Sequence, residues 1–142
     1  MFIDTSALVA MIVGEPDAGP LAAVVERADI RRTSPLVRLE ACAVLATRLD
    51  ITPAQADGLF DDLLAEADIA VVPITDEIGR MAVACFATYG KGRHAARLNI
   101  VDCFSYACAR ALGVSLLFKG DDFGQTDIEN ANQPPQAGAD LT

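Results

Sequence analysis

Short apolar runs alternate along the chain with longer segments that begin at capping residues and end near a glycine. The short runs have the length and composition of buried strands, whereas the capped segments have the start and stop signals of helices. The predicted strands are residues 2–3, about 30–33, 69–72 and 114–118. The predicted helices are residues 5–14, 17–28, 35–49, 53–67, 75–89 and 100–112.

This alternation indicates an α/β fold, a three-layer sandwich in which helices cover both faces of a parallel sheet of four or five short strands. Sites in such sheets lie just beyond the carboxyl ends of the strands. No repeat or linker interrupts residues 1–129, which we expect to form one domain. Residues 130–142 are rich in Pro, Gln and Asn and carry no apolar pattern, so we expect a flexible tail there.

The composition excludes several classes of protein. With 142 residues, 52% hydrophobic and 22% charged, the chain is neither disordered nor a coiled coil, and its four cysteines form no C-x-x-C pair. We expect these thiols to be buried. No apolar run approaches the roughly 20 residues of a membrane span, and the first residues lack the cationic start of a signal peptide. The chain is therefore expected to be cytoplasmic, without a membrane partner.

Glu40 is the acid that folding explains least well. On its predicted helix the residues three and four positions away are Leu36, Val37, Ala43 and Val44, so the carboxylate projects from an apolar stripe. An ionised carboxylate is costly to bury there unless a cation or hydrogen-bond donors meet it. The structural alternative is an acid at the rim of the core that pairs with a neighbouring arginine, Arg38 or Arg48.

Other acids occupy the ends of strands and the starts of helices. Asp4 follows the first strand, Asp102 lies in the first turn of its helix, and Asp121 and Asp122 follow the last strand. Taken singly, each has an ordinary explanation. Asp4 can cap the next helix, Asp102 can form a capping pair with Asn99, and the two adjacent acids can form an Asx turn.

Taken together, these acids predict a metal site. Carboxylates after the first and last strands of a parallel sheet lie at one edge, where acids on neighbouring helices can join them. Such a cluster repels itself unless it is protonated or holds a cation, and a set of oxygen ligands without His or Cys selects Mg²⁺ or Mn²⁺. These metals activate water for phosphodiester cleavage. The single histidine excludes a catalytic pair of imidazoles, and no Walker or G-x-S-x-G motif is present.

Four segments carry a family resemblance. They are M-F-I-D-T-S-A-L at the start, S-P-L-V-R-L-E ending at Glu40, L-N-I-V-D-C-F-S-Y-A at 98–107 and L-L-F-K-G-D-D-F-G-Q-T-D-I at 116–128. In their order and spacing they resemble the PIN-domain family, and more narrowly its VapC-type toxin ribonucleases. The resemblance implies the PIN-like sandwich and an endoribonuclease that depends on Mg²⁺ or Mn²⁺. It also implies a VapB-type antitoxin whose C-terminal segment blocks the site, and a homodimer.

The resemblance also assigns roles to the acids. It implies that Asp4 and Asp102 are the principal metal ligands and that Glu40 is a third acid, bound directly or through water. The fourth acid is Asp121 or Asp122, with Asp122 preferred. The hydroxyl groups that follow the first acid, those of Thr5 and Ser6, would support the site by hydrogen bonds, with Ser6 preferred.

A cationic segment offers a place for RNA despite the net charge of −9. Lys91, Arg93 and Arg97 stand with the only histidine just before the helix of Asp102, and Lys119 stands beside the last acids. We expect them to bind RNA phosphates, although a merely solvated loop would have the same composition. A tRNA, an mRNA or a ribosomal RNA would suit such a site equally well.

Three further expectations are open to test. Phe60, Leu63 and Leu64 could form an exposed ridge for a second subunit or the antitoxin. A receiver-like, Mg²⁺-binding signalling module has a similar length and class, but it places its paired acids after the first strand rather than the last. A catalytically silent PIN-like protein that only sequesters its partner is the other alternative.

Overall fold

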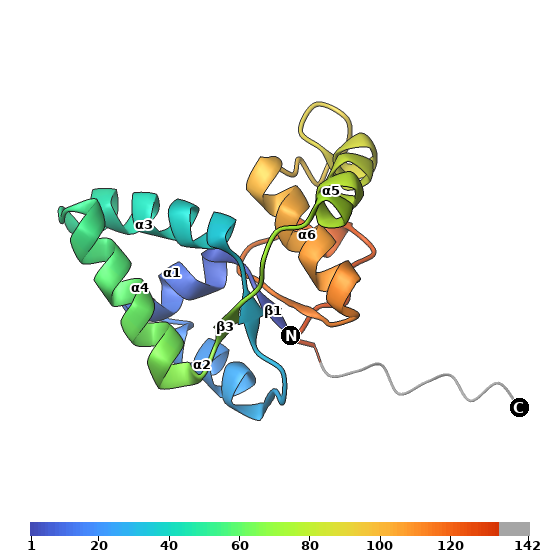
Figure 1. Ribbon diagram of the computed structural model, residues 1–142. Coiled ribbons are helices and arrows are strands. Elements are labelled where there is room, and N and C mark those ends of the chain that lie inside the picture. Colours follow the sequence, from blue (N-terminus) through green and yellow to red (C-terminus); the bar gives the residue numbers. More distant parts are fainter. Residues whose placement is uncertain (134–142) are drawn as a thin grey trace, which may run out of the picture.

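Four parallel strands form the sheet at the centre of residues 1–133, the part of the chain that the computed structural model describes (Figure 1). Their order is β3–β2–β1–β4, and Phe2 pairs with Arg32 on one side and with Leu116 on the other. The strands are β1 (Phe2–Ile3), β2 (Arg32–Thr33), β3 (Ala70–Val71) and β4 (Leu116–Leu117). The predicted parallel α/β sheet is confirmed, with β2 and β1 as its inner strands.

Six α-helices connect and cover these strands. They are α1 (Thr5–Val13), α2 (Ala18–Arg27), α3 (Pro35–Leu49), α4 (Pro53–Ala67), α5 (Asp76–Tyr89) and α6 (Ile100–Leu112). Five of them begin at a side chain that accepts a hydrogen bond from the first turn, as the sequence predicts. Gly14 and Gly113 end α1 and α6 in the left-handed conformation, with φ of 79° and 65°. Within residues 1–133, no single helix is long and apolar enough to cross a membrane.

The helices form two groups on the two sides of the sheet (Figure 1). Helix α6 packs against β1 and β4 and is covered by α5, whereas α1 packs with α2, α3 and α4 on the other side. The core between them is aliphatic, and Phe2, Ile3 and Leu117 are fully buried within it. All four cysteines are buried and free, as expected. This arrangement leaves the carboxyl ends of β1 and β4 beside the starts of α1, α3 and α6.

Two predictions about apolar residues are wrong. The strand at residues 69–72 was expected to be buried, but Ala70 and Val71 are exposed because β3 is the edge strand of the sheet. The ridge on α4 is also absent. Phe60 is completely buried, and Leu63 and Leu64 pack against the core, since this face of α4 lies on the other helices of its group.

The start of the expected flexible tail is held in place. The amide of Leu116 donates to the carbonyl of Glu129 at 2.9 Å, and the amide of Ala131 donates to the carbonyl of Leu116 at 2.9 Å. The Asn132 side chain donates to the carbonyl of Phe118 at 2.9 Å. These bonds satisfy the outer edge of β4, which would otherwise be unpaired. The rest of the expected tail, residues 134–142, lies outside the described residues.

Candidate active site

Asp4 lies where β1 ends and α1 begins, and it is buried with only 2% of its surface exposed. As the N-cap of α1 it accepts a hydrogen bond from the amide of Ser6, so its capping role is confirmed. The hydroxyl of Ser6 donates to its Oδ2 at 2.9 Å, and the hydroxyl of Ser105 donates to its Oδ1 at 2.8 Å. Burial raises the pKa of Asp4, and these hydrogen bonds oppose the rise.

Glu40 is half-buried on α3, and neither of the expected arginines is its partner. Arg38 instead forms ion pairs with Asp57 at 2.6 Å and Asp61 at 2.8 Å on α4, and Arg48 pairs with Glu15. Burial raises the pKa of Glu40, and the negative charge of Asp4 raises it further. The structural alternative for Glu40, an ordinary ion pair at the rim of the core, is therefore wrong.

Asp102 combines a structural role with a perturbed ionisation. Its Oδ2 accepts from the amide of Asn99 at 3.0 Å, and the Asn99 side chain accepts from the amide of Asp102 at 2.9 Å, which completes a capping box at the start of α6. Burial raises the pKa of Asp102 to about 7, and the charges of Asp4, Glu40 and Asp122 add to the rise. The four carboxyl groups are therefore close enough to interact, although they come from four separate parts of the chain.

Two adjacent acids, Asp121 and Asp122, follow β4. Both Asp121 and Asp122 are exposed, and neither carboxylate accepts a hydrogen bond within residues 1–133, so the Asx turn that would be their ordinary explanation is absent. Asp122 precedes the short 3₁₀ helix η1 (Phe123–Gln125), and its charge acts on Asp102. This effect supports Asp122 as the fourth acid, which stays a prediction.

Three hydroxyl groups surround the acids, and one of them was missed from the sequence. Ser6, the hydroxyl that we preferred, binds Asp4 and accepts from the amide of Lys119 at 2.9 Å. Thr5 is buried beside Glu40 and opposes the rise in the pKa of Glu40. Its Oγ1 makes no hydrogen bond of ordinary geometry in the described part of the chain. Ser105 is the missed residue. It lies three positions after Asp102, so helical spacing alone places both on one face of α6.

The donor chemistry of this cluster fits a hard cation. Four carboxylates and a buried hydroxyl without a partner provide only oxygen ligands, which are those that Mg²⁺ and Mn²⁺ prefer. No three acidic, His or Cys side chains in residues 1–133 are already arranged to hold a metal ion. Asp102 is turned toward its capping bond, and both oxygens of Asp4 accept from serines.

The cationic segment is anchored at its base and exposed at its tip. The amide of Lys91 donates to the carbonyl of Leu98 at 3.0 Å, and Ala96 and Leu98 are completely buried. Lys91, Arg93 and Arg97 are exposed and form no ion pair with any described residue, while the Arg93 guanidinium lies 5.3 Å from the Phe86 ring centroid. Their charges therefore face solvent, on the connection that leads into α6.

Lys119 was expected to contact RNA, but its ammonium group is already paired. It binds the carboxylates of Glu15 and Asp17, which lie between α1 and α2, and Glu15 also binds Arg48. Hydrogen bonds to Lys119 and Arg48 lower the pKa of Glu15. Lys119 therefore connects the end of β4 to the segment between α1 and α2, and its contact with RNA stays a prediction.

Comparison with known proteins places this arrangement in a family. The model of the PIN domain matches residues 1–129, and the chain belongs to the PIN-domain family. "Ribonuclease VapC30" of Mycobacterium tuberculosis is 44% identical over 135 residues, which cover 94% of this chain and 100% of that protein. "Ribonuclease VapC28" of the same species is 40% identical over 132 residues, 92% of this chain and 97% of that protein.

Solved structures have the same fold. The crystal structure of M. tuberculosis VapC20, described as a toxin that cleaves the sarcin–ricin loop, superposes with a TM-score of 0.70 at 21% identity and covers 89% of this chain and 95% of its own. A toxin–antitoxin complex from Klebsiella pneumoniae gives a TM-score of 0.64 at 16% identity, over 89% of this chain and 92% of its own. Family membership and fold together exclude the receiver-like alternative.

Proposed function

We propose that this chain is the toxin of a toxin–antitoxin pair, an endoribonuclease that cleaves RNA phosphodiester bonds in the cytoplasm. The observation that carries the proposal is the convergence of Asp4, Glu40, Asp102 and Asp122, seen in the effect of the other three on the pKa of Asp102. Relatives that are 39–44% identical over nearly their whole length are named VapC ribonucleases. The same convergence is the main argument against a catalytically silent protein.

PIN-domain VapC ribonucleases are generally dependent on divalent metals, and we propose Mg²⁺ or Mn²⁺ as the cofactor here. Asp4, Asp102 and Asp122 would hold the ion, with Glu40 as a direct ligand or one acting through water. When bound, the metal lowers the pKa of a water molecule and stabilises charge on the leaving oxygen. Without a cation, burial and mutual repulsion favour the neutral form of these acids, which raises the pKa of Asp102 to about 7 and also raises the pKa of Glu40.

We propose that RNA reaches this site along the connection between α5 and α6. Lys91, Arg93 and Arg97 provide charge-assisted hydrogen bonds to phosphates. Because these three cations are clustered, they create a positive surface locally despite the net charge of −9. Contacts of this kind position a strand without reading its bases. A tRNA, an mRNA or a ribosomal RNA loop therefore fits the same site.

The partner that we propose is a VapB-type antitoxin whose C-terminal segment covers the acids. The relatives' names and the toxin–antitoxin complex with the same fold support such a partner. The antitoxin segment would cover both the acids and the cationic segment if it places basic groups opposite the acids and acidic groups opposite the cations. Inhibition would then follow from exclusion of both the metal and the RNA.

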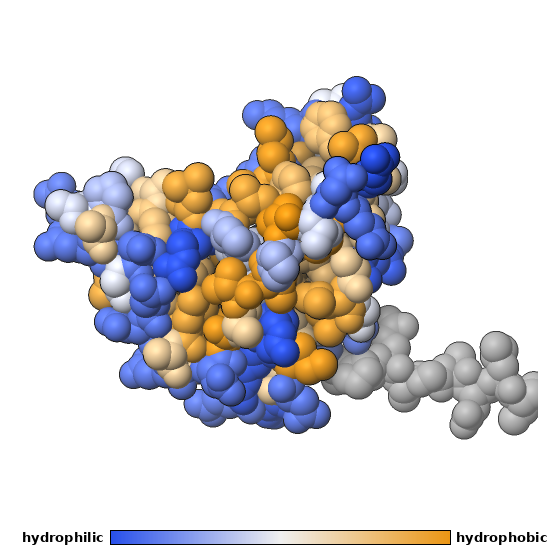
Figure 2. All heavy atoms as spheres, viewed as in Figure 1, coloured by the Kyte–Doolittle hydropathy of each residue, from blue (hydrophilic) through white to orange (hydrophobic). Residues whose placement is uncertain are grey.

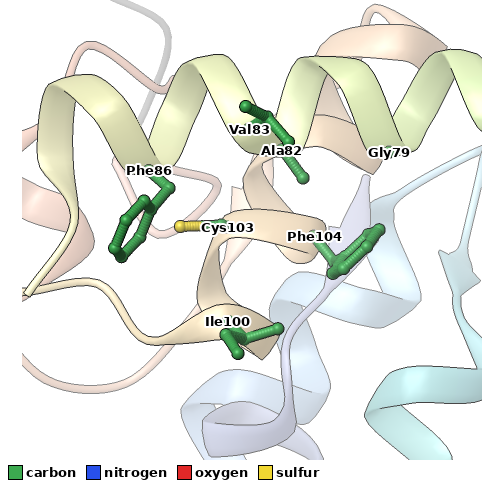
Figure 3. A pocket seen from close by; sticks show the side chains of 7 residues that line it. All are labelled: Gly79, Ala82, Val83, Phe86, Ile100, Cys103 and Phe104. Atoms are coloured by element: carbon green, nitrogen blue, oxygen red, sulfur yellow. The ribbon is translucent and has the colours of Figure 1, made fainter.

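We further propose that the chain forms a homodimer, through an apolar face that replaces the ridge expected on α4. Val83 and Ile100 are 70% and 71% exposed, on α5 and α6 respectively. They line a hollow of about 190 Å³, together with Phe86 and Phe104, and Cys103 lies at its base (Figure 3). In the view of Figure 2, apolar residues also gather between the α3–α4 pair and the α5–α6 pair. Sedimentation of Val83→Asp and Ile100→Asp variants tests this, with monomers expected.

The experiment that tests the function is cleavage of total cellular RNA by antitoxin-free protein. The expected result is a set of discrete fragments with Mg²⁺ or Mn²⁺, and none with EDTA or with the Asp102→Asn variant. Asparagine preserves the size of the side chain and the oxygen that caps α6, so the variant should fold. Intact RNA under every metal condition, from folded protein, would favour the catalytically silent alternative.

A further inference from the structure

The family motif at the end of the chain contains an acid that the proposed chemistry does not use. Asp127 lies five residues after Asp122 and is bound on both of its oxygens by helix α6. Tyr106 donates its hydroxyl to Oδ1 at 2.5 Å, and Arg110 pairs with Oδ2 at 2.6 Å. The Arg110 guanidinium also lies 5.4 Å from the centroid of the Tyr106 ring. We call these three residues the Asp127 clamp.

The clamp closes a short segment that carries the fourth acid. At the start of the segment, the amide of Lys119 donates to Ser6, the residue that holds Asp4. In the middle, Phe123 is buried against Phe118, with ring centroids 5.2 Å apart. At the end, Asp127 is held by α6. The exposed Asp121 and Asp122 therefore lie between anchors on both sides.

Helical spacing links the clamp to the other acids. Tyr106 lies four residues after Asp102, and Arg110 lies four residues after Tyr106, so the three share one face of α6. The segment that contains Asp122 is thus attached along the same helical stripe that begins with Asp102. Because Asp122 makes no side-chain hydrogen bond within residues 1–133, its distance from Asp102 depends on how its segment is attached.

We propose that the Asp127 clamp is a positioning device that sets Asp122 at its working distance from Asp102. This inference rests on the proposed nuclease function, and none of the three clamp residues needs to touch metal or RNA. Both oxygens of the Asp127 carboxylate take part in charge-assisted interactions, with Tyr106 and with Arg110. Two such interactions fix the orientation of this carboxylate better than a single surface ion pair would. The hydroxyl bond and the guanidinium together lower the pKa of Asp127, so it remains ionised.

The first test measures the segment in metal-free protein. Hydrogen exchange followed by mass spectrometry should show faster exchange of residues 119–127 in Asp127→Asn and Tyr106→Phe variants than in the unmodified protein. The matched control is Asp76→Asn, which removes an exposed Asp76–Arg80 pair on α5 that does not contact this segment. Unchanged exchange at 119–127 in both clamp variants would overturn the proposal, whatever the protein does to RNA.

The second test asks whether the clamp acts through Asp122. Asp127→Asn should lower the kcat for RNA cleavage about tenfold with little change in KM, and the same change in an Asp122→Asn background should have almost no further effect. A clamp that only stabilises the fold would lower activity by the same factor in both backgrounds, and that result would overturn the positioning role. Absence of cleavage by the unmodified protein would instead contradict the proposed function, while the exchange result would still stand.

Discussion

Ser105 donates a hydrogen bond of 2.8 Å to Oδ1 of Asp4, across 101 positions of the sequence. Both residues are buried, with exposures of 1% and 2%. The bond joins the start of α1 to α6. Oδ1 of Asp4 thus accepts from the Ser105 hydroxyl, while Oδ2 accepts from the hydroxyl and the amide of Ser6. The orientation of the central acid is thus determined by two serines, one of them adjacent in sequence and one distant.

Ser105→Ala should therefore affect both stability and catalysis. Loss of the hydroxyl that donates to this buried carboxylate oxygen should lower the free energy of unfolding by about 1–3 kcal/mol, and misorientation of Asp4 should lower cleavage of RNA at least tenfold. Denaturant unfolding and cleavage assays measure the two effects. Ser115→Ala is the control, since its hydroxyl makes no hydrogen bond within residues 1–133. Equal behaviour of the two variants would contradict the role of Ser105.

Asp102 should make the stability of the metal-free protein fall as pH rises. Its pKa is raised from an ordinary value near 3.8 to about 7 in the folded protein. Between these values the folded protein holds a proton that the unfolded chain has released, so the free energy of unfolding decreases with rising pH. The test compares the two proteins in EDTA. The Tm of the unmodified protein minus the Tm of Asp102→Asn should decrease as the pH is raised from about 4 to about 7.

That comparison isolates Asp102 from acids that act in the opposite sense. Glu15 and Asp127 have lowered pKa values because of their hydrogen bonds, so their contribution to stability is lost as pH falls. Both are present in the variant and the unmodified protein, and their effects cancel in the difference. Parallel curves of Tm against pH would show that Asp102 ionises normally. Added Mg²⁺ should reduce the difference, because a bound cation favours the charged carboxylate.

The adjacent acids after β4 offer a matched pair for identifying the fourth acid. Asp122→Asn should lower RNA cleavage by about a hundredfold, whereas Asp121→Asn should change it less than threefold, because the charge of Asp122 acts on Asp102 and we place Asp122 among the metal ligands. Both side chains are exposed and make no hydrogen bonds in the described structure, so neither change should alter Tm by more than about 1 °C. A larger loss in Asp121→Asn would reverse the assignment.

The three cations between α5 and α6 should determine how the affinity for RNA depends on salt concentration. The Lys91/Arg93/Arg97→Ala variant should bind RNA more weakly, and the slope of log K against log salt should fall by about one for each phosphate contact removed. An inactive Asp102→Asn background keeps the RNA intact during the measurement. Arg27→Ala/Arg80→Ala, which removes exposed cations elsewhere, serves as the control. An unchanged slope in the triple variant would mean that the segment is only solvated.

The sequence by itself determined the helices and strands, and it predicted the acids of the site at Asp4, Glu40 and Asp102. Capping residues and terminal glycines act within a few positions, so the start of α3 at Ser34-Pro35 and the ends of α1 and α6 followed from local chemistry. Glu40 stood out because a charge in an apolar helical stripe is visible without any knowledge of neighbours. The arginines next to it in sequence suggested an ion pair, and only the packing of α3 on α4 showed that Arg38 binds Asp57 and Asp61.

Only the tertiary structure decided the contacts between distant parts of the chain. The sequence could not place β3 at the sheet edge, where Val71 is exposed, because strand order depends on crossovers. Nor could it show Lys119 paired with Glu15, Ser105 bound to Asp4, or Asp127 held by α6. Each of these bonds joins residues 21 to 104 positions apart. Their formation depends on burial and on the meeting of whole helices, which local propensity does not encode.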